Sequence, residues 1–392
     1  MLQSRTIVSL NSGSSSLKFA VYRLGFGTEE RLIAGAVEQI GLPSGRFWVS
    51  GKTGAMQVDE IRKFSTSREA FETLLTLLQQ SGLPTADAFG HRVVHGGPEH
   101  VEPELVTREL LDSLKACVPL ARLHLPSQLA GIEFLHHARP SIPQVACFDT
   151  TFHHRIPEVA QRLPLRRDLW NQGLRKYGFH GLSYDYVVNC LGDAAKGAVI
   201  IAHLGNGASM AAVRDGHPVD TSMSFTPTGG IMMGTRSGDL DPGILLYLLK
   251  EKGYDSARLT RLVEEEAGLL GVSETTSDMK QLLKQAASDP RAAQAIEMFC
   301  YSAKKQIGAL ASALGGLNIL VFTGGIGEKA PEIRMGICRG LAFLGIELHP
   351  TKNRANEKTI STPESRCTVQ VIPTDEDLMV ARYTYRVAFG TS

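Results

Sequence analysis

Short apolar runs separated by Gly, Pro and Ser dominate the first sixty residues of the chain. Runs bounded in this way predict strands over 6–10, 18–22, 31–40 and 47–50. The period changes after residue 68, where Phe71, Leu74, Leu75 and Leu78 recur at helical spacing before Gly82. The pattern therefore predicts a helix over 68–80, strands over 88–94 and 144–148, and helices near 105–116 and 127–138.

The second half of the chain repeats this order, with strands first and helices later. Apolar runs predict strands within 197–213, and helical patterns follow over 243–252, 256–268, 277–288 and 291–315. The glycines at 315 and 316 end the last helix, and LNILVFT over 317–323 predicts a buried strand. Two halves of like order favour a duplicated α/β architecture.

Two similar loops open these halves. Residues 10–15 read LNSGSS and residues 204–209 read LGNGAS, and each stretch joins two strand-like runs. Hairpins rich in small residues resemble one another for conformational reasons. The similarity alone therefore does not distinguish a duplication from two unrelated hairpins. Combined with the repeated order of elements, it predicts two related domains with the active-site cleft between them.

Length and composition exclude several classes of protein. The 392 residues exceed one ordinary core, and the net charge of +1 gives no general attraction to nucleic acid or acidic membranes. The six cysteines contain no C-x-x-C pair, which argues against a zinc knuckle or redox dithiol and favours free thiols in a reducing cytoplasm. No signal peptide or apolar run of about 18 residues is present, so we expect a cytoplasmic protein without a membrane span.

Three glycine-rich or serine-rich loops could bind phosphate through their backbone N–H groups. They cover 11–16, 204–209 and 323–328, each follows a predicted strand, and Lys18 lies just beyond the first. One such loop is weak evidence, but three indicate a nucleotide site. The stretch 45–53 resembles a Walker loop but has five residues between its glycines instead of four, so we predict a hairpin turn over 51–54.

Charged residues at strand ends are the candidate catalytic groups. Arg92 lies within a short apolar strand, where it either forms an internal ion pair or directs its guanidinium at an anion. Asp149 directly follows another strand, and its alternative role is a helix cap or turn residue. Arg236 is the single arginine in a long loop rich in Gly, Ser and Thr, and His180 lies between glycines. The TDED segment at 374–377 is either a solvated acidic turn or a source of Mg²⁺ ligands.

Eight stretches, in this order, make the chain resemble the acetate kinase family of acetate and propionate kinases over nearly its whole length. They are NSGSSSLKF (11–19), GHRVVHGG (90–97), FDTTFH (148–153), KYGFHG (176–181), HLGNGAS (203–209), MGTRSGDLDPG (233–243), TGGIGE (323–328) and TDED (374–377). The resemblance implies the duplicated, ribonuclease H-like α/β fold shared with sugar kinases, actin and Hsp70-type ATPases. It also implies ATP or ADP, Mg²⁺ or possible Mn²⁺, and a homodimer. The implied first domain is 1–150 with 375–392, and the implied nucleotide-binding and dimerising domain is 151–374.

The resemblance also implies roles for the matching residues. The implied catalytic residues are Asn11, Arg92, Asp149, His180, Arg236 and Glu376, with Asn11 and Glu376 organising Mg²⁺. The implied nucleotide-binding residues are Lys18, His203, Leu204, Gly205, Asn206, Gly207, Asp278, Met279, Lys280, Gly325, Ile326, Gly327, Glu328 and Lys329. The implied substrate-binding residues are Arg92 and Arg236, with Val94, Leu123, Phe179 and Pro227 around the alkyl group.

The implied reaction is direct, in-line phosphoryl transfer between ATP and acetate. A carboxylate is already ionised at neutral pH, so Asp149 is expected to orient Mg²⁺, waters or Arg236 and not to abstract a proton. The alternatives are a propionate kinase or a broad short-chain carboxylate kinase, although Val94 favours the shorter acid. A nucleotide-dependent clamp without enzymatic activity is a rival from another class. Departures from the family pattern occur at 125, at 182–184, and at Lys280 and Lys329.

Overall fold

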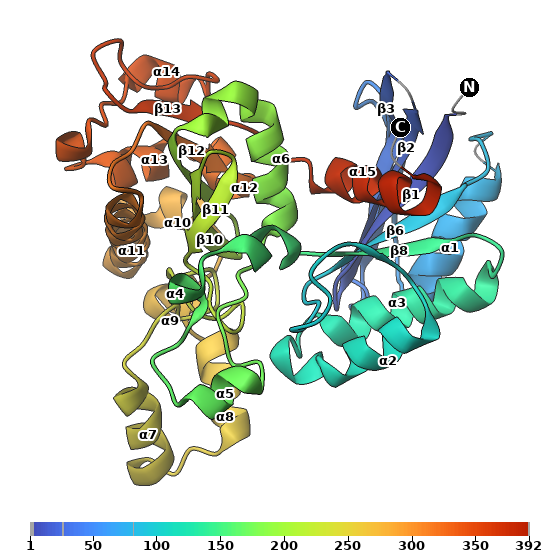
Figure 1. Cartoon of the computed structure of the whole chain (residues 1–392), viewed down its shortest axis with the longest axis horizontal. Helices are drawn as coiled ribbons and strands as arrows, with labels where there is room; N and C mark the ends of the chain where they lie inside the picture. The colour runs from blue at the N-terminus through green and yellow to red at the C-terminus, as the bar shows by residue number, and fades with distance from the viewer. Residues whose placement is uncertain (1–3, 26, 81, 391–392) are drawn as a thin grey trace. The chain divides into compact units, whose positions relative to one another are not determined.

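A computed structural model describes residues 4–25, 27–80 and 82–390 of the chain (Figure 1). The strands are β1 (Arg5–Ser12), β2 (Ser16–Gly25), β3 (Thr28–Glu38), β4 (Gly45–Gly51), β5 (Met56–Arg62), β6 (Ala88–Val93), β7 (Glu104–Leu105), β8 (Gln144–Phe148), β9 (Ala198–Leu204), β10 (Ala208–Arg214), β11 (His217–Thr221), β12 (Ile319–Thr323) and β13 (Thr368–Val371). The first helices are α1 (Ser67–Gln80), α2 (Arg108–Ala116), α3 (Leu125–Ala138), α4 (Glu158–Gln161), α5 (Arg167–Asn171), α6 (Gly181–Leu191) and α7 (Pro242–Glu251). The remaining helices are α8 (Ser256–Glu264), α9 (Gly268–Ser273), α10 (Met279–Gln285), α11 (Pro290–Leu314), α12 (Gly324–Lys329), α13 (Pro331–Cys338), α14 (Pro350–Arg354) and α15 (Glu376–Phe389).

The chain divides into two compact units. Unit 1 comprises Met1–Thr151 together with Asp375–Ser392, and unit 2 comprises Phe152–Thr374. Both ends of the chain therefore belong to unit 1, while unit 2 is a single uninterrupted segment.

Unit 1 is built on an eight-stranded sheet in the order β5-β4-β3-β2-β1-β6-β8-β7. Strands β1 to β5 form an antiparallel meander, and β6 and β8 continue from β1 in parallel. Helices α1 and α3 cover an apolar cluster that includes Leu10, Phe19 and Phe71. Helix α15 packs across β1, β2, β6 and β8 over a separate cluster that includes Ile7 and Tyr22. The alternating apolar positions of the strands thus fill both faces of the sheet.

Unit 2 repeats this arrangement on a smaller scale. Its sheet has the order β11-β10-β9-β12-β13, with β11, β10 and β9 antiparallel and β12 and β13 parallel to β9. Strands β3-β2-β1-β6-β8 of unit 1 have the same order and the same directions. Helix α6 covers the cluster around Tyr184, Val199 and Ile201, and α11 packs against β9, β10 and β11. The duplicated α/β architecture predicted from the sequence is confirmed.

Local differences from the prediction have simple causes. Strand β5 was not predicted because its sequence, MQVDEIR, is almost wholly exposed and lacks an apolar alternation. The turn predicted between residues 51 and 54 is confirmed, since Gly54 N donates to Gly51 O at 2.9 Å between β4 and β5. Helix α8 ends at Glu264, four residues before the predicted end. In the described parts of the chain, no helix combines the length and apolarity needed to cross a membrane.

Candidate active site

Arg92 and Asp149 meet at the ends of neighbouring strands in unit 1. Arg92 belongs to β6, and Asp149 directly follows β8, which pairs with β6 in parallel. Arg92 Nη2 lies 2.6 Å from Asp149 Oδ2, and Arg92 Nε lies 3.1 Å from Asp149 Oδ1. The Arg92 side chain is 18% exposed and that of Asp149 is 1% exposed. The internal ion pair considered for Arg92 is therefore formed, although its side chain remains partly exposed.

Two further polar side chains approach the same guanidinium. Arg92 Nη1 donates to Asn11 Oδ1 at 3.4 Å and lies 3.7 Å from Glu376 Oε2. Burial by itself lowers the pKa of Arg92, but the charges of Asp149 and Glu376 outweigh that effect and the net shift is upward. Arg92 consequently stays cationic while three oxygen-bearing side chains surround it.

The TDED segment at 374–377 is the start of a helix and not a solvated acidic turn. The Asp375 carboxylate caps α15 by accepting from Leu378 N at 2.9 Å. Ser9 Oγ donates to Asp377 Oδ1 at 2.7 Å, and burial raises the pKa of Asp377. Helix α15 thereby holds Glu376 near Arg92, a placement that the local sequence could not show.

The first predicted phosphate loop is the tight turn between β1 and β2. Gly13 N donates to Ser16 O at 2.8 Å, which closes the turn. Asn11 and Lys18 lie opposite each other in the antiparallel register, and Lys18 is exposed. The turn therefore presents an amide and an ammonium group from the same end of the hairpin.

The side chains of Asn11 and Glu376 offer hard oxygen donors of the kind that Mg²⁺ prefers. No set of three or more His, Cys, Asp or Glu residues within 4–25, 27–80 and 82–390 is arranged to hold a metal ion. Mg²⁺ is commonly bound by one or two carboxylates together with waters and substrate phosphate oxygens. One carboxylate and one amide oxygen beside Arg92 fit that mode of binding.

The second predicted phosphate loop is the corresponding turn of unit 2, between β9 and β10. Leu204 pairs with Ala208, and Gly205 N donates to Gly207 O at 3.0 Å. The two similar sequence stretches therefore occupy equivalent hairpins of the duplicated fold. Small residues keep both turns narrow and their backbone accessible.

Three cationic or titratable side chains of unit 2 gather around this second turn. A Cβ atom at Gly207 would lie 3.3 Å from His180 Nε2 and 3.7 Å from Arg236 Nη1, so the glycine leaves a space between those two nitrogens. The His180 ring stacks on that of His203, with centroids 4.3 Å apart and planes inclined by 21°. His180 and Arg236, which are far apart in sequence, thus border one small space that suits an anion, and His203 supports the ring of His180.

The long loop that carries Arg236 is fixed at several points. Arg236 Nη1 donates to Pro227 O at 3.0 Å, and Gly234 N donates to Asn206 O at 2.9 Å. A Cβ atom at Gly234 would lie only 2.0 Å from Asn206 Oδ1, so a side chain there would break this contact. The loop is therefore attached directly to the second phosphate turn.

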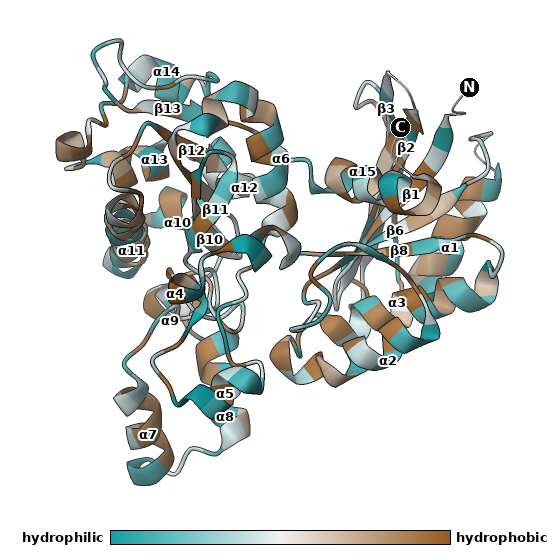
Figure 2. Ribbon diagram, in the orientation of Figure 1, coloured by the Kyte–Doolittle hydropathy of each residue, from teal (hydrophilic) through white to brown (hydrophobic). Residues whose placement is uncertain are grey.

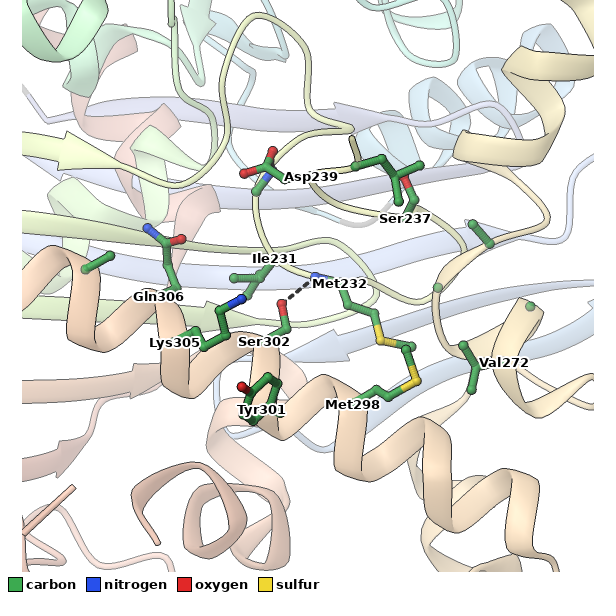
Figure 3. A pocket seen from close by; sticks show the side chains of 16 residues that line it. Ile231, Met232, Ser237, Asp239, Val272, Met298, Tyr301, Ser302, Lys305 and Gln306 are labelled. Atoms are coloured by element: carbon green, nitrogen blue, oxygen red, sulfur yellow. Dashed lines mark hydrogen bonds between the residues drawn. The ribbon is translucent and has the colours of Figure 1, made fainter. Parts of the chain in front are cut away.

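The other side of this loop faces α9 and α11 across a cavity of about 620 Å³ (Figure 3). Met232 N donates to Ser302 Oγ of α11 at 3.1 Å, the contact marked by a dashed line in Figure 3. Met298 and Tyr301 of α11 are 44% and 60% exposed beside it. This cavity was not predicted from the sequence, because its lining comes from three separate segments.

A second cavity, of about 640 Å³, brings together most of the residues expected to bind the nucleotide. The expected residues that line it are Gly205, Asn206, Asp278, Met279, Lys280, Gly325, Ile326 and Lys329. Ser277, Leu283 and Ala330 complete the described lining, so the wall is mixed polar and apolar. Its volume is within the range of small-molecule sites.

The third predicted phosphate loop is a helix. Residues Gly324–Lys329 form α12, which begins directly after β12. The glycines of this stretch made a helix hard to predict from the sequence. At Gly324 a glycine is needed, because φ is +75° and a Cβ atom would lie 2.8 Å from Leu204 O. Glu328 Oε1 accepts from Gly324 N at 3.0 Å and from Thr374 N at 3.1 Å, so it supports the helix and does not line the cavity.

Arg334 is a supporting residue that the sequence did not reveal. This side chain is 0% exposed, yet its Nη1 atom donates to Gly327 O at 2.8 Å and to Glu328 O at 3.0 Å. Its Nε and Nη2 atoms donate to Asn353 at 2.8 Å and 2.7 Å. It therefore holds the end of α12 and with it one wall of the second cavity. In the sequence, the only sign of this role was a charged residue among the apolar positions of 330–338.

The residues expected around the alkyl group of the substrate are divided between the two units. Val94 is 5% exposed and Leu123 is 37% exposed in unit 1. Phe179 is 1% exposed in unit 2, where its carbonyl oxygen accepts from His153 Nε2 at 2.9 Å. Pro227 lies in the same unit and accepts from Arg236, as described above.

Comparison with known proteins gives a consistent result along the whole chain. The model of the acetokinase family matches residues 6–382. The chain is 45% identical to the acetate kinase of Rhodopseudomonas palustris, with 99% of each sequence covered. It is 43% identical to the acetate kinase of Methylocella silvestris, with 97% of each covered.

Solved structures give the same picture. The structure of Porphyromonas gingivalis acetate kinase has a TM-score of 0.85 at 37% identity. The match covers 98% of this chain and 100% of that chain. The structure of a propionate kinase from Francisella tularensis has a TM-score of 0.91 at 36% identity, with the same coverage. The family match and these full-length relatives agree with the duplicated fold and the motifs described above, and the chain belongs to the acetokinase family.

Proposed function

We propose that the chain is an acetate kinase, which reversibly transfers the γ-phosphoryl group of ATP to the carboxylate of acetate and forms acetyl phosphate and ADP. Membership of the acetokinase family supports a phosphotransferase with a carboxylate acceptor. The observation that carries the proposal is the space beside Gly207, bordered by His180 Nε2 and Arg236 Nη1. Asn206 and Gly205 of the same turn also line a cavity large enough for a nucleoside.

The main difficulty of this reaction is the approach of two anions. Acetate is ionised at neutral pH, so no strong base is needed to create the nucleophile. Arg92 and Arg236 supply the positive charge that offsets the repulsion, and His180 donates to an oxygen of the transferring group. Catalysis then consists of positioning and electrostatic stabilisation, with no covalent intermediate on the protein.

Asp149 has a positioning role in this scheme. Both of its carboxylate oxygens accept from Arg92, at 3.1 Å and 2.6 Å, and its side chain is 1% exposed. A carboxylate engaged in this way fixes the plane of the guanidinium. We assign it to the orientation of Arg92, which then binds the carboxylate of the substrate.

Asn11 and Glu376 are assigned to Mg²⁺, with Mn²⁺ as a possible replacement. When bound, the ion would neutralise charge on the phosphate oxygens of ATP. Helix α15 and the end of β1 hold the two oxygen donors 3.7 Å and 3.4 Å from Arg92 Nη1. Lys18, across the hairpin from Asn11, is assigned to the phosphates of the nucleotide.

The acyl group is proposed to be short. Val94 and Leu123 of unit 1 and Phe179 and Pro227 of unit 2 are assigned to its surroundings, and Val94 favours acetate over longer acids. One methylene is worth only about 1–3 kcal/mol in such a site. Propionate is the second candidate, because a propionate kinase is among the similar structures. Values of kcat/KM for acetate, propionate and butyrate decide between them, and Val94→Ala should shift the preference toward propionate.

The active form is proposed to be a homodimer in the cytoplasm. Helix α7 contains six apolar residues directly after its Pro-Gly start, yet it buries none of its residues, and Leu246 and Tyr247 are 53% and 52% exposed (Figure 2). An apolar helix of this kind is typical of an interface, and we assign a second copy of the chain as its partner. None of the six cysteines forms a disulfide, which fits a reducing compartment.

A hydroxamate assay for acyl phosphate is the decisive experiment. The purified protein is incubated with ATP, Mg²⁺ and acetate, and trapping by hydroxylamine should give acetohydroxamate. If ATP binds but no hydroxamate forms with acetate, propionate or butyrate, the proposed function is wrong. The nucleotide-dependent clamp would then gain support.

A further inference from the structure

Tyr184, one turn along α6 from His180, is connected to that histidine through a third side chain. Tyr184 is 0% exposed, and its ring packs against those of Phe152 and His153, with centroids 5.9 Å and 5.4 Å away. A hydroxyl group buried among aromatic rings is costly unless it forms a hydrogen bond. The Tyr184 hydroxyl forms one with Ser209 Oγ of β10.

Ser209 connects this phenol to the histidine. Its side chain is 0% exposed, and Oγ also lies 2.8 Å from His180 Nδ1. A serine hydroxyl has one proton to donate and can accept two. A phenol is the more acidic of the two hydroxyl types, and an imidazole nitrogen accepts well. The favoured order is therefore Tyr184 O–H to Ser209 Oγ, and Ser209 O–H to His180 Nδ1.

This order decides which nitrogen of the neutral His180 ring carries the proton. With Nδ1 accepting from Ser209, the proton must lie on Nε2. Nε2 is the atom that borders the space beside Gly207, opposite Arg236 Nη1. A neutral ring with the reverse assignment would present a lone pair to an anion and repel it.

The ring is held in place from its other face as well. His180 itself has a left-handed backbone, with φ of 59°, at the start of α6. Its ring stacks on His203, whose Nδ1 atom lies 2.8 Å from Ser183 Oγ, also on α6. Rotation of the His180 ring would break both the stack and the bond to Ser209.

We propose that Tyr184, acting through Ser209, places the proton on Nε2 of His180 and so makes this histidine a hydrogen-bond donor to the transferring phosphoryl group. Tyr184 is a positioning residue, because its hydroxyl reaches the substrate only through two other side chains. The inference rests on the proposed function only where it identifies the group bound by His180 as a phosphoryl group. The state of the His180 ring is independent of it.

The experiment combines kinetics with NMR of protein labelled with ¹⁵N in its histidine rings. The resonances of His180 are identified by their loss in His180→Gln. In the wild-type protein, neutral His180 should show an unprotonated Nδ1 and a protonated Nε2. In Tyr184→Phe the two nitrogens should move toward averaged positions, and kcat should fall about 10-fold to 100-fold with KM values for ATP and acetate unchanged.

Controls separate positioning from loss of structure. Tyr177→Phe removes another buried hydroxyl, which donates to Gly173 O at 2.7 Å, and should leave the His180 resonances unchanged. Ser209→Ala should reproduce the NMR change if Tyr184→Phe does not fold. A wild-type Nδ1 that carries the proton, or nitrogens that do not respond in either folded variant, would overturn the inference. Absence of kinase activity with the expected wild-type NMR pattern would instead reject only the proposed function.

Discussion

The Asp149 carboxylate accepts hydrogen bonds from both Nε and Nη2 of Arg92. This two-point ion pair is the most buried charged contact among the candidate site residues of unit 1. We predict that Arg92→Ala and Asp149→Ala each cost at least about 2 kcal/mol of transition-state stabilisation. If Asp149 acts by orienting Arg92, the double variant should lose much less than the sum of the two single losses. Additive losses in kcat/KM would show instead that Asp149 acts independently of Arg92.

Gly207 provides a sharp steric test of unit 2. Gly207→Ala would place a methyl group 3.3 Å from His180 Nε2 and 3.7 Å from Arg236 Nη1, in the space assigned to the phosphoryl group. We expect kcat to fall at least about tenfold with little change in stability. Gly308→Ala is the matched control, since no atom lies within 4 Å of its added methyl and alanine favours the helix. Equal activity of both variants would remove the space beside Gly207 from the proposed site.

Arg334 should affect nucleotide binding without touching the nucleotide. Arg334→Met keeps the volume of the side chain but removes the donors to Gly327 O and Glu328 O. We expect the KM for ATP to rise while the KM for acetate stays close to its wild-type value, because α12 loses its anchor. Arg339→Met, on an exposed residue just beyond α13, is the control. A parallel rise in both KM values would point to general destabilisation.

His91 makes part of the stability of unit 1 dependent on pH. It is 3% exposed, its Nε2 atom lies 2.7 Å from Gln144 Oε1, and burial lowers its pKa to about 4. Below pH about 6.5 the unfolded chain therefore binds a proton at His91, which the folded chain binds only near pH 4. The free energy of unfolding consequently decreases as the pH is lowered from about 6.5 to about 4. Between pH 7 and pH 5 this amounts to about 2 kcal/mol.

The check is urea unfolding at pH 7 and pH 5. His91→Gln should lose about 2 kcal/mol less than the wild-type protein between the two values, whatever its stability at pH 7. His137→Gln, on an exposed residue of α3, should keep the wild-type dependence. A variant with an unchanged slope would show that His91 is not held neutral.

Helix α7 allows a test of the proposed dimer. Leu246→Glu introduces a charge at a position that is 53% exposed within one chain, and it should weaken self-association at least about tenfold if α7 meets a second copy. Light scattering after size-exclusion chromatography measures the change. Ile61→Glu, on a residue of β5 that is 68% exposed, should leave the oligomer intact. A monomeric wild-type protein would refute the dimer.

The sequence predicted the architecture because its apolar runs are short, regular and bounded by glycine and proline. The hairpins at Gly13 and Gly207 were visible for the same reason. The residues that pack these elements together were not visible. Ser9 and Asp377 are 368 positions apart, and only the packing of α15 on β1 brings them into contact.

Elements whose stability comes from distant partners were the ones misjudged. The TGGIGE stretch has poor helix formers, yet α12 is stabilised by Arg334 and Glu328. The sequence left TDED open between a solvated turn and a source of Mg²⁺ ligands, because the packing of α15 on β1 that decides its structure is a tertiary contact. Local patterns thus predicted the fold class and the approximate position of the candidate residues, whereas the hydrogen bonds that orient them depend on tertiary contacts.

The division of unit 1 along the chain has a consequence for biosynthesis. Strands β1, β2 and β6 leave the ribosome before unit 2, but α15, which covers Ile7, Ala20 and Tyr22, is made only after unit 2. Unit 2 is contiguous and can complete its core while that apolar face of unit 1 still lacks its cover. Nascent chains stalled before residue 375 should therefore be bound by chaperones that recognise exposed apolar surface. Unit 2 would then complete its core before unit 1, although the translation of unit 1 begins first.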